Sequence, residues 1–204
     1  MPATASSEIP QEDTRQRILN AATQLFAEIG YAQATTRLIA DAAEVNEVTL
    51  FRHFGNKKAL LMACVDAKNA SGFTATFGAG LSGVYAEDIL WMARHQIADM
   101  RANVGILRML LCEARNIPEL RQVLLQGARG NQARLSRYFQ GQIEAGTIRE
   151  GLSADALAIA FDSLFSSSIL FEYAFQDTLS PQLSIDELAR PLADLFVKGT
   201  GRVE

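Results

Sequence analysis

Residues 35–58 read TTRLIADAAEVNEVTLFRHFGNKK, and this stretch decides the expected fold of the N-terminal part of the chain. Residues 35–43 and 47–54 have the spacing of two short helices, and the three residues 44–46 form a turn between them. Such a pair is the layout of a helix-turn-helix, whose second helix enters the major groove of DNA. The same pattern also allows a helical hairpin whose polar residues only face solvent.

The second helix of this pair has an apolar and a polar side. Leu50 and Phe54 on it, with Ile39 and Val45 before it, provide the apolar contact between the two helices. The outward positions are polar and lie near the N-terminus of the second helix, from which side chains reach base edges. They are Asn46, Glu47, Thr49, Arg52 and His53.

Hydroxyl and basic groups flank the pair where DNA phosphates would lie. Thr36 opens the first helix, and Lys57 and Lys58 follow the second. The chain of 204 residues has a net charge of −4, so no global field attracts nucleic acid. Residues 14–60, however, contain six Lys or Arg and four Asp or Glu, a local charge of +2. DNA binding would therefore depend on this local surface.

Helical periodicity continues through almost the whole chain. A first helix begins at Asp13 or Thr14 and ends at Gly30. No stretch has a convincing strand pattern, so the sequence predicts an all-α fold of about nine helices. The later helical segments are 57–70, 87–101, 104–114, 118–146 (with Gly127 and Gly130 as candidate breaks), 154–175 and 185–198.

The stretch TTRLIADAAEVNEVTLFRHFGNKKALL resembles the DNA-binding domain of TetR-family transcriptional regulators. Its Thr-Thr-Arg opening and its Thr-Leu-aromatic-x-His and Asn-Lys-x-Ala-Leu-Leu elements are especially similar to those of the tetracycline repressor. The first helix, which ends Leu-Phe-Ala-x-x-Gly-Tyr at residues 25–31, extends the resemblance to about residues 14–62. Residues 1–11 are expected to be an untethered tail. The resemblance implies a three-helix DNA-binding domain at 12–56 and a helical ligand-binding and dimerisation domain at 57–200.

The resemblance also implies roles for single residues. Thr36 would contact a phosphate and Arg37 a base, while His53 and Lys57 would anchor phosphates. Base edges and sugars would face Glu47, Thr49 and Arg52. An arginine that binds guanine through two hydrogen bonds contributes about 1–3 kcal/mol of discrimination.

Two positions depart from the family pattern. Glu44 stands where the family usually has a glycine, at a turn residue that tends to need φ > 0, so we expect some backbone strain there. Phe51 replaces a frequent tyrosine, which keeps the ring but removes a hydroxyl directed at phosphate. Glu47 repels phosphate, which lowers the overall affinity for DNA. Its carboxylate can accept a hydrogen bond from cytosine N4, which increases the selectivity for base sequence.

The C-terminal part is expected to dimerise and to hold a small molecule. The dimer interface is predicted to contain Leu157, Phe161, Leu164, Phe165, Leu188, Leu192, Leu195 and Phe196, although both stripes also suit the core of a monomer. Candidate pocket residues are Phe77, Trp91, His95, Met109, Cys112 and Glu113. Aromatic and methionine side chains would favour a largely apolar effector, but such residues are also typical of plain core.

Together these features predict a ligand-responsive transcriptional regulator, expected to be a repressor that binds a pseudo-palindromic operator on double-stranded DNA as a homodimer. The alternative is a helical small-molecule binding protein whose hairpin no longer binds DNA. Activation instead of repression also stays open.

Other functions lack a sequence signal. With two histidines and no Cys cluster, there is no metal-binding motif, no cofactor motif and no catalytic motif, so we expect neither a metal, a cofactor nor an enzyme. Cys64 and Cys112 lie in apolar runs and are expected to be buried, reduced thiols. Residues 78–83 match G-x-G-x-x-G but lack the several strands of a dinucleotide-binding fold. No segment resembles a signal peptide or a membrane span, so we expect a cytoplasmic protein.

Overall fold

The computed structural model describes residues 13–71, 76–174 and 183–202. Within these residues the chain forms eight α-helices and a single isolated β-bridge between Ile148 and Gly201, which confirms the all-α prediction. The helices are α1 (Thr14–Gln33), α2 (Thr36–Ala42), α3 (Glu47–Phe54), α4 (Lys57–Ser71), α6 (Tyr85–Glu113), α7 (Pro118–Glu144), α8 (Ala154–Ala174) and α9 (Ile185–Thr200).

The chain divides into two compact units, Met1–Asp66 and Ala67–Glu204, and the division falls within α4. The sequence-based boundary after residue 56 stays a prediction, and the expected tail at 1–11 lies outside the described residues. In the first unit, α1, α2 and α3 enclose a small core with fully buried side chains. Its members include Ile18, Phe26, Ile39, Leu50 and Leu60.

Side-chain caps set the starts of the first three helices. Asp13, Thr35 and Asn46 each accept a hydrogen bond from a backbone N–H in the first turn of the helix that follows. Gly30 was predicted to end α1, and it adopts φ 81° there, but helical residues continue from it to Gln33. The glycine therefore kinks this helix near its end.

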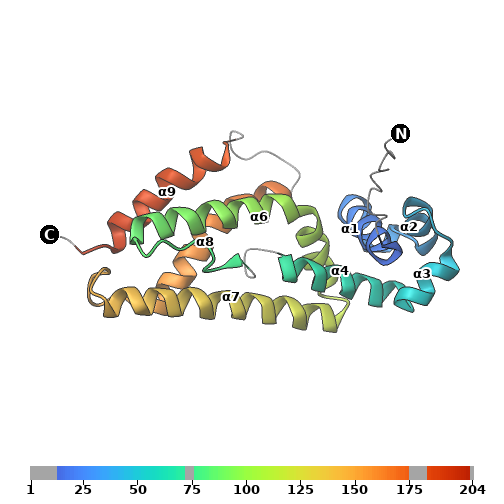
Figure 1. Ribbon diagram of the computed structural model, residues 1–204, viewed down its shortest axis with the longest axis horizontal. Coiled ribbons are helices and arrows are strands. Elements are labelled where there is room, and N and C mark those ends of the chain that lie inside the picture. The colour runs from blue at the N-terminus through green and yellow to red at the C-terminus, as the bar shows by residue number, and fades with distance from the viewer. Residues whose placement is uncertain (1–12, 72–75, 175–182, 203–204) are drawn as a thin grey trace, which may run out of the picture. The chain divides into compact units, whose positions relative to one another are not determined.

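The second unit is a bundle in which α7 packs on α8, and α6 lies against both α8 and α9 (Figure 1). Its centre is aromatic. The ring centroid of Phe161 lies 4.6 Å from that of Phe165, 5.6 Å from that of Phe196 and 6.1 Å from that of Phe139. All four rings are buried, so this cluster joins α7, α8 and α9 in the core of the unit.

The long helices correct three predicted breaks. The segments 87–101 and 104–114 are parts of one 29-residue helix, α6, in which Asn103 donates a side-chain hydrogen bond to the Asp99 carbonyl one turn earlier. Helix α7 also runs unbroken through Gly127 and Gly130. A glycine costs a helix only about 1 kcal/mol, and the burial of Leu135 and Phe139 on α7 outweighs that.

Half of the predicted dimer interface lies in the core of the single chain. Leu157, Phe161, Phe165 and Phe196 are buried within the second unit, so they offer no surface to a partner. Leu164, Leu188 and Leu192 are half-buried, and Leu195 is 63% exposed. Ile159 on α8, which the sequence did not single out, is 54% exposed. The outward apolar surface of α8 and α9 therefore differs from the predicted one.

Candidate nucleic-acid interface

The helix-turn-helix turn has the predicted geometry. Glu44 adopts φ 54°, and among the described residues it is the one non-glycine residue with positive φ. Asn46 then begins α3, and its side-chain oxygen accepts from the backbone N–H of Thr49 at 2.7 Å. Ile39 and Leu50 are fully buried, which gives the expected apolar contact between α2 and α3.

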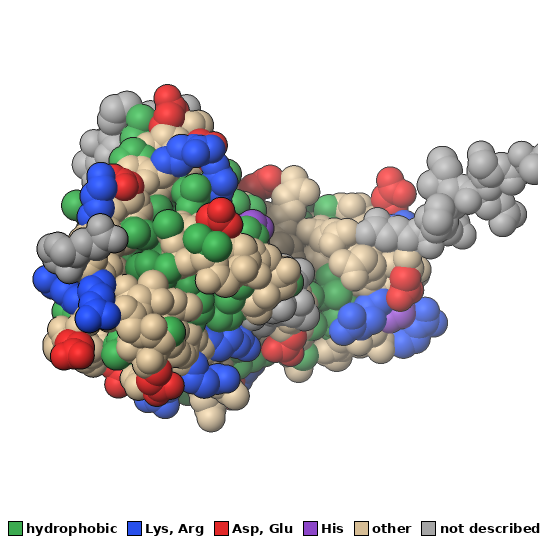
Figure 2. All heavy atoms as spheres, turned by 60° about the vertical axis from the view of Figure 1, so that its left-hand side comes forward, with side chains coloured by type: hydrophobic (Ala, Val, Ile, Leu, Met, Phe, Trp, Pro, Cys, Tyr) green, Lys and Arg blue, Asp and Glu red, His purple; other side chains and the backbone are tan. Residues whose placement is uncertain are grey.

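The solvent-facing side of α3 is exposed and mixed in character. Arg52 and His53 are exposed, and Glu47 and Thr49 are half-buried. Phe51 is 42% exposed, so the ring that replaces a tyrosine also lies on the surface. Arg37, on α2, is exposed as well. Figure 2 shows Lys and Arg side chains gathered next to a histidine on this unit.

Several of the predicted DNA-binding groups already have partners inside the protein. The Thr36 hydroxyl donates to Glu47 Oε1 at 2.6 Å, which joins the start of α2 to the start of α3. Lys57 Nζ lies 3.3 Å from the Ala32 carbonyl oxygen and 4.4 Å from the ring centroid of Tyr31. By contrast, neither Arg37 nor Arg52 has a charged or hydrogen-bonding partner among the described residues. The guanidinium groups of these two arginines can therefore bind DNA without breaking a contact among the described residues.

Comparison with known proteins agrees with this geometry. Residues 18–64 match the model of the bacterial regulatory proteins of the tetR family. Residues 18–64 are therefore a tetR-family DNA-binding domain. Its helix-turn-helix is therefore a DNA-binding unit, and the family is one of transcriptional regulators.

Relatives cover the chain to different extents. The uncharacterized HTH-type transcriptional regulator YvkB of Bacillus subtilis is 25% identical over 187 residues, which is 91% of this chain and 96% of the relative. The HTH-type transcriptional repressor Rv3405c of Mycobacterium tuberculosis is 45% identical over 67 residues, 32% of this chain and 36% of the relative. The structure of FadR from Bacillus subtilis in complex with stearoyl-CoA has a TM-score of 0.69 and 19% identity, covering 90% of this chain and 98% of FadR. That likeness shows the fold.

The strained turn at Glu44 of this tetR-family domain gives a stability prediction. A left-handed conformation costs a residue with a Cβ about 1–2 kcal/mol, and glycine adopts it freely. We expect Glu44→Gly to raise the free energy of unfolding by about 1 kcal/mol, because part of the gain is offset by the greater entropy of glycine in the unfolded chain. Urea denaturation followed by circular dichroism measures the change.

Glu44→Gln is the matched control for that substitution. It removes the charge, and with it the 3.9 Å pair with Arg17, but keeps the Cβ at φ 54°. The pair is exposed, so its loss should change stability little. If the glutamine variant were as stable as the glycine variant, charge repulsion and not backbone strain would be the cause.

The six predicted pocket residues do not lie together. Trp91 and His95 stack on one stretch of α6, with ring centroids 4.0 Å apart. Met109, Cys112 and Glu113 lie near the other end of the same helix, and at 1.5 Å per residue Trp91 and Cys112 are about 30 Å apart. Phe77 precedes α6 and is half-buried. These residues can share one ligand only if it is long, so their joint role stays a prediction.

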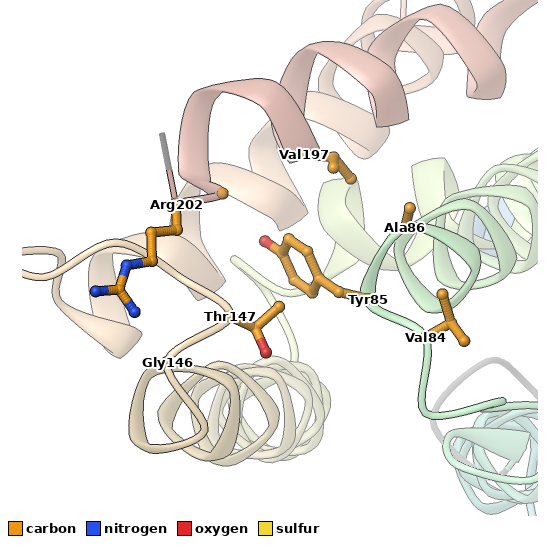
Figure 3. Close-up of a pocket in the computed structure, with 8 residues that line it drawn as sticks. Val84, Tyr85, Ala86, Gly146, Thr147, Val197 and Arg202 are labelled. Carbon is orange, nitrogen blue, oxygen red and sulfur yellow. The ribbon is translucent and has the colours of Figure 1, made fainter. Parts of the chain in front are cut away.

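A surface cavity of about 580 Å³ lies elsewhere in the second unit, and none of the six residues lines it. Figure 3 shows the ring of Tyr85 between α9 and the segment that follows α7, with Thr147, Val197 and Arg202 around it. The Tyr85 hydroxyl lies 2.6 Å from the Thr200 hydroxyl oxygen. The cavity is open to solvent, and its one charged lining residue is Arg202.

A polar cluster around the buried Gln96 joins α6, α7 and α8, and no pattern in the sequence indicated it. Gln96 Nε2 donates to Asp162 Oδ1 at 2.9 Å and to the Ser166 hydroxyl oxygen at 2.6 Å. Asn131 donates to the same Asp162 oxygen at 3.2 Å. Burial raises the pKa of Asp162, and the hydrogen bonds from Gln96 and Asn131 oppose that rise. Buried oxygens of Gln96 and Asn131 and one nitrogen of Arg134 have no hydrogen-bond partner among the residues that the structure describes.

The glycine loop at 78–83 has a structural role. The Asp88 carboxylate accepts from the backbone N–H groups of Ser82 and Gly83, at 2.6 and 3.2 Å, so these amides are not available to a phosphate. Tyr138 also donates to Asp88, and burial together with that carboxylate raises the pKa of Tyr138, which keeps the hydroxyl protonated. A Cβ on Gly80 would lie 2.2 Å from the Trp91 ring, so glycine is needed for this close approach.

The two cysteines differ. Cys64 is buried, as predicted, and burial raises the pKa of its thiol to about 11, so it is an unreactive core residue. Cys112 is exposed, which corrects the prediction that both thiols are buried. Its helix turns it away from the core although the surrounding run is apolar.

In the described part of the chain, no helix is long and apolar enough to cross a membrane, and no group of side chains could hold a metal ion.

Proposed function

We propose that this chain is a ligand-responsive repressor that binds a pseudo-palindromic operator as a homodimer and is released by a small, largely apolar effector. The observation that carries the proposal is the exposed side of α3, where Arg52 and His53 face solvent, together with the exposed Arg37 of α2. Residues at the start of such a helix reach base edges, and uncommitted arginines suit guanine. The name of the Mycobacterium tuberculosis relative, a repressor, supports repression over activation.

A dimer is proposed because two recognition helices are needed to contact half-sites about 34 Å apart. The outward side of α8 and α9 offers the surface for it, with exposed Ile159 and Leu195 next to half-buried Leu164, Leu188 and Leu192. Two helices from each subunit would then pack as a four-helix interface. Two-fold symmetry of the protein would be matched by two-fold symmetry of the operator.

Leu195→Glu tests this interface. We expect the variant to be a folded monomer, since Leu195 is 63% exposed and contributes little to the core of its own chain. Loss of the dimer should lower operator affinity by roughly a hundredfold or more, because the second half-site no longer binds in the same complex. Sedimentation velocity gives the oligomeric state, and fluorescence anisotropy gives the affinity.

Leu125→Glu is the matched control, since Leu125 is 44% exposed but lies on α7. It should stay dimeric and bind the operator as the parent protein does. A Leu195→Glu protein that is still dimeric would place the interface on another surface.

The effector proposal depends on the interior of the second unit. Its aromatic and aliphatic core favours an apolar ligand body, and the polar cluster at Gln96 and Asp162 offers hydrogen bonds for a polar end. The Bacillus subtilis FadR structure holds stearoyl-CoA, so acyl compounds of different lengths are a suitable first panel. For the effector to release the operator, it must bind the conformer that does not bind DNA more tightly than the DNA-binding conformer. Such a coupling free energy is commonly about 1–3 kcal/mol.

The first experiment measures binding of the purified protein to DNA fragments that flank its own gene, at 50 and 200 mM salt. Selective binding that weakens steeply with salt would support the proposal, because several phosphate contacts are lost together. A reporter gene placed behind the bound fragment should be expressed less when the protein is present. If the folded protein binds no fragment at low salt, the alternative of a small-molecule binding protein with an inactive hairpin is favoured.

A further inference from the structure

We propose that Glu47 and Val48 read a cytosine and a neighbouring thymine in each half-site, and that Thr36 positions Glu47 instead of holding a phosphate. This inference rests on the proposed function, because it concerns the bases that the same interface selects. It assigns a new role to Thr36, and a role to Val48, which no pattern in the sequence indicated. Three observations on the first unit carry it.

The first observation is the exposure of Val48. Its side chain is 75% exposed, the highest value among the exposed large hydrophobic side chains of the described residues. Val48 is the second residue of α3 and shares a side of the helix with Phe51 and Arg52, which follow it by three and four residues. Arg52 and Phe51 are exposed there too. In the major groove, the one apolar group on a base edge is the C5-methyl of thymine, so this valine suits an A·T pair.

The second observation is the Thr36–Glu47 hydrogen bond. At 2.6 Å it is a short bond from a hydroxyl to a carboxylate, and such charge-assisted bonds are stronger than neutral ones. It joins residues eleven positions apart, so it fixes the Glu47 side chain relative to both helices. The Thr36 hydroxyl donates its single proton to Glu47 and has none left for a phosphate. Thr36 is therefore a positioning residue.

The third observation is what remains of the Glu47 carboxylate. Among the described residues, no group donates to its second oxygen, Oε2. An ionised carboxylate only accepts hydrogen bonds, and the major-groove donors are cytosine N4 and adenine N6. Adenine places its N7 lone pair beside N6, which repels a carboxylate, whereas cytosine places an apolar C5–H beside N4. Glu47 therefore selects cytosine.

Glu47 and Val48 are consecutive residues in the first turn of α3, so they face the same or adjacent base pairs. The half-site should therefore contain a C·G pair next to an A·T pair whose thymine methyl faces α3. Arg37 and Arg52, which prefer guanine, would contact other positions.

Selection of bound sequences from random DNA tests the cytosine assignment. The parent protein should yield a two-fold symmetric motif with a C·G position that Glu47→Gln changes to A·T, because glutamine pairs with adenine N6 and N7. Discrimination at that position should be about ten- to hundredfold. Asp41→Asn is the matched control, since Asp41 is an exposed acid of α2 and its change alters the charge equally. It should leave the motif unchanged.

Deoxyuridine, which lacks the methyl group of thymine, tests Val48. Replacing the thymine next to the selected cytosine by deoxyuridine should weaken binding of the parent protein about fourfold per half-site, the value of one buried carbon group. The same replacement should not affect Val48→Ala. Equal losses for both proteins would show that Val48 does not contact the methyl group.

Substitutions of Thr36 test its positioning role. Thr36→Val removes the hydroxyl at nearly constant shape and should reduce the preference for cytosine at the Glu47 position, while the remaining motif stays. Thr36→Ser keeps the hydroxyl and should restore the preference. If Thr36→Val instead lowered affinity for all sequences equally and flattened the salt dependence, Thr36 would be a phosphate contact and the inference would be wrong.

The outcomes separate this inference from the proposed function. A clear motif in which Glu47→Gln changes no position overturns the reading of cytosine but leaves DNA binding intact. Failure of the parent protein to select any motif would overturn the proposed function itself.

Discussion

Arg37→Ala will remove selective DNA binding while the protein stays folded. Arg37 is exposed on α2 and has no partner among the described residues, so its loss leaves no buried group unpaired. A bidentate arginine–guanine contact is worth about 1–3 kcal/mol, and a dimer makes it twice, so roughly 2–6 kcal/mol of operator affinity depends on this residue. Anisotropy titrations with operator and with unrelated DNA should give the same weak affinity for the variant.

Arg37→Lys distinguishes base reading from simple charge. Lysine keeps the positive charge but is a point donor without the planar fork of a guanidinium. We expect the lysine variant to keep the salt dependence and the nonspecific affinity of the parent, and to lose most of its preference for the operator. If it bound the operator as the parent does, Arg37 would contact a phosphate and not a base.

Phe161→Ala will have the largest effect on stability. The Phe161 ring is fully buried and contacts the rings of Phe139, Phe165 and Phe196, with centroids at 4.6–6.1 Å. Truncation of a buried phenylalanine loses its burial and leaves a cavity, at a cost of about 3–5 kcal/mol. That is a large fraction of the total stability of an ordinary domain. Urea denaturation followed by far-UV circular dichroism should therefore show a much lower midpoint.

The same variant separates a core position from an interface position. Substitution of a core residue destabilises the folded chain, so helical structure is lost at a lower urea concentration. An interface residue would instead leave a folded monomer, as expected for Leu195→Glu. Leu125→Ala, at a 44% exposed position of α7, is the control and should change stability by less than about 1 kcal/mol. A Phe161→Ala protein that unfolds like the parent but no longer dimerises would contradict the core assignment.

The sequence by itself determined the helix-turn-helix. Its signals are local: Asn46 caps α3 through a backbone group three residues later, Gly55 with φ 76° ends it, and Leu50 and Phe54 recur at helical spacing. The positive φ of Glu44 was expected from the resemblance to the TetR family, whose pattern usually has a glycine at this turn position. Interactions within a few residues are visible in the order of the amino acids.

Only the tertiary structure decided which apolar side chains of α8 face inward. Helical periodicity shows which residues share a side of a helix, but α8 is apolar around much of its surface, so periodicity cannot tell core from partner contact. Packing places Phe161 and Phe165 in the aromatic cluster and leaves Ile159 outside. The exposure of Cys112 depends in the same way on what the rest of the unit covers.

Long-range hydrogen bonds were likewise beyond the sequence. The bond from Thr36 to Glu47 and the cluster of Gln96, Asn131 and Asp162 join different helices. Their formation depends on side-chain rotamers and on helix packing, to which spacing along the chain gives no guide. The sequence therefore identified the helix-turn-helix, and the fold decided how its polar groups are aimed, because direction is set by contacts between helices.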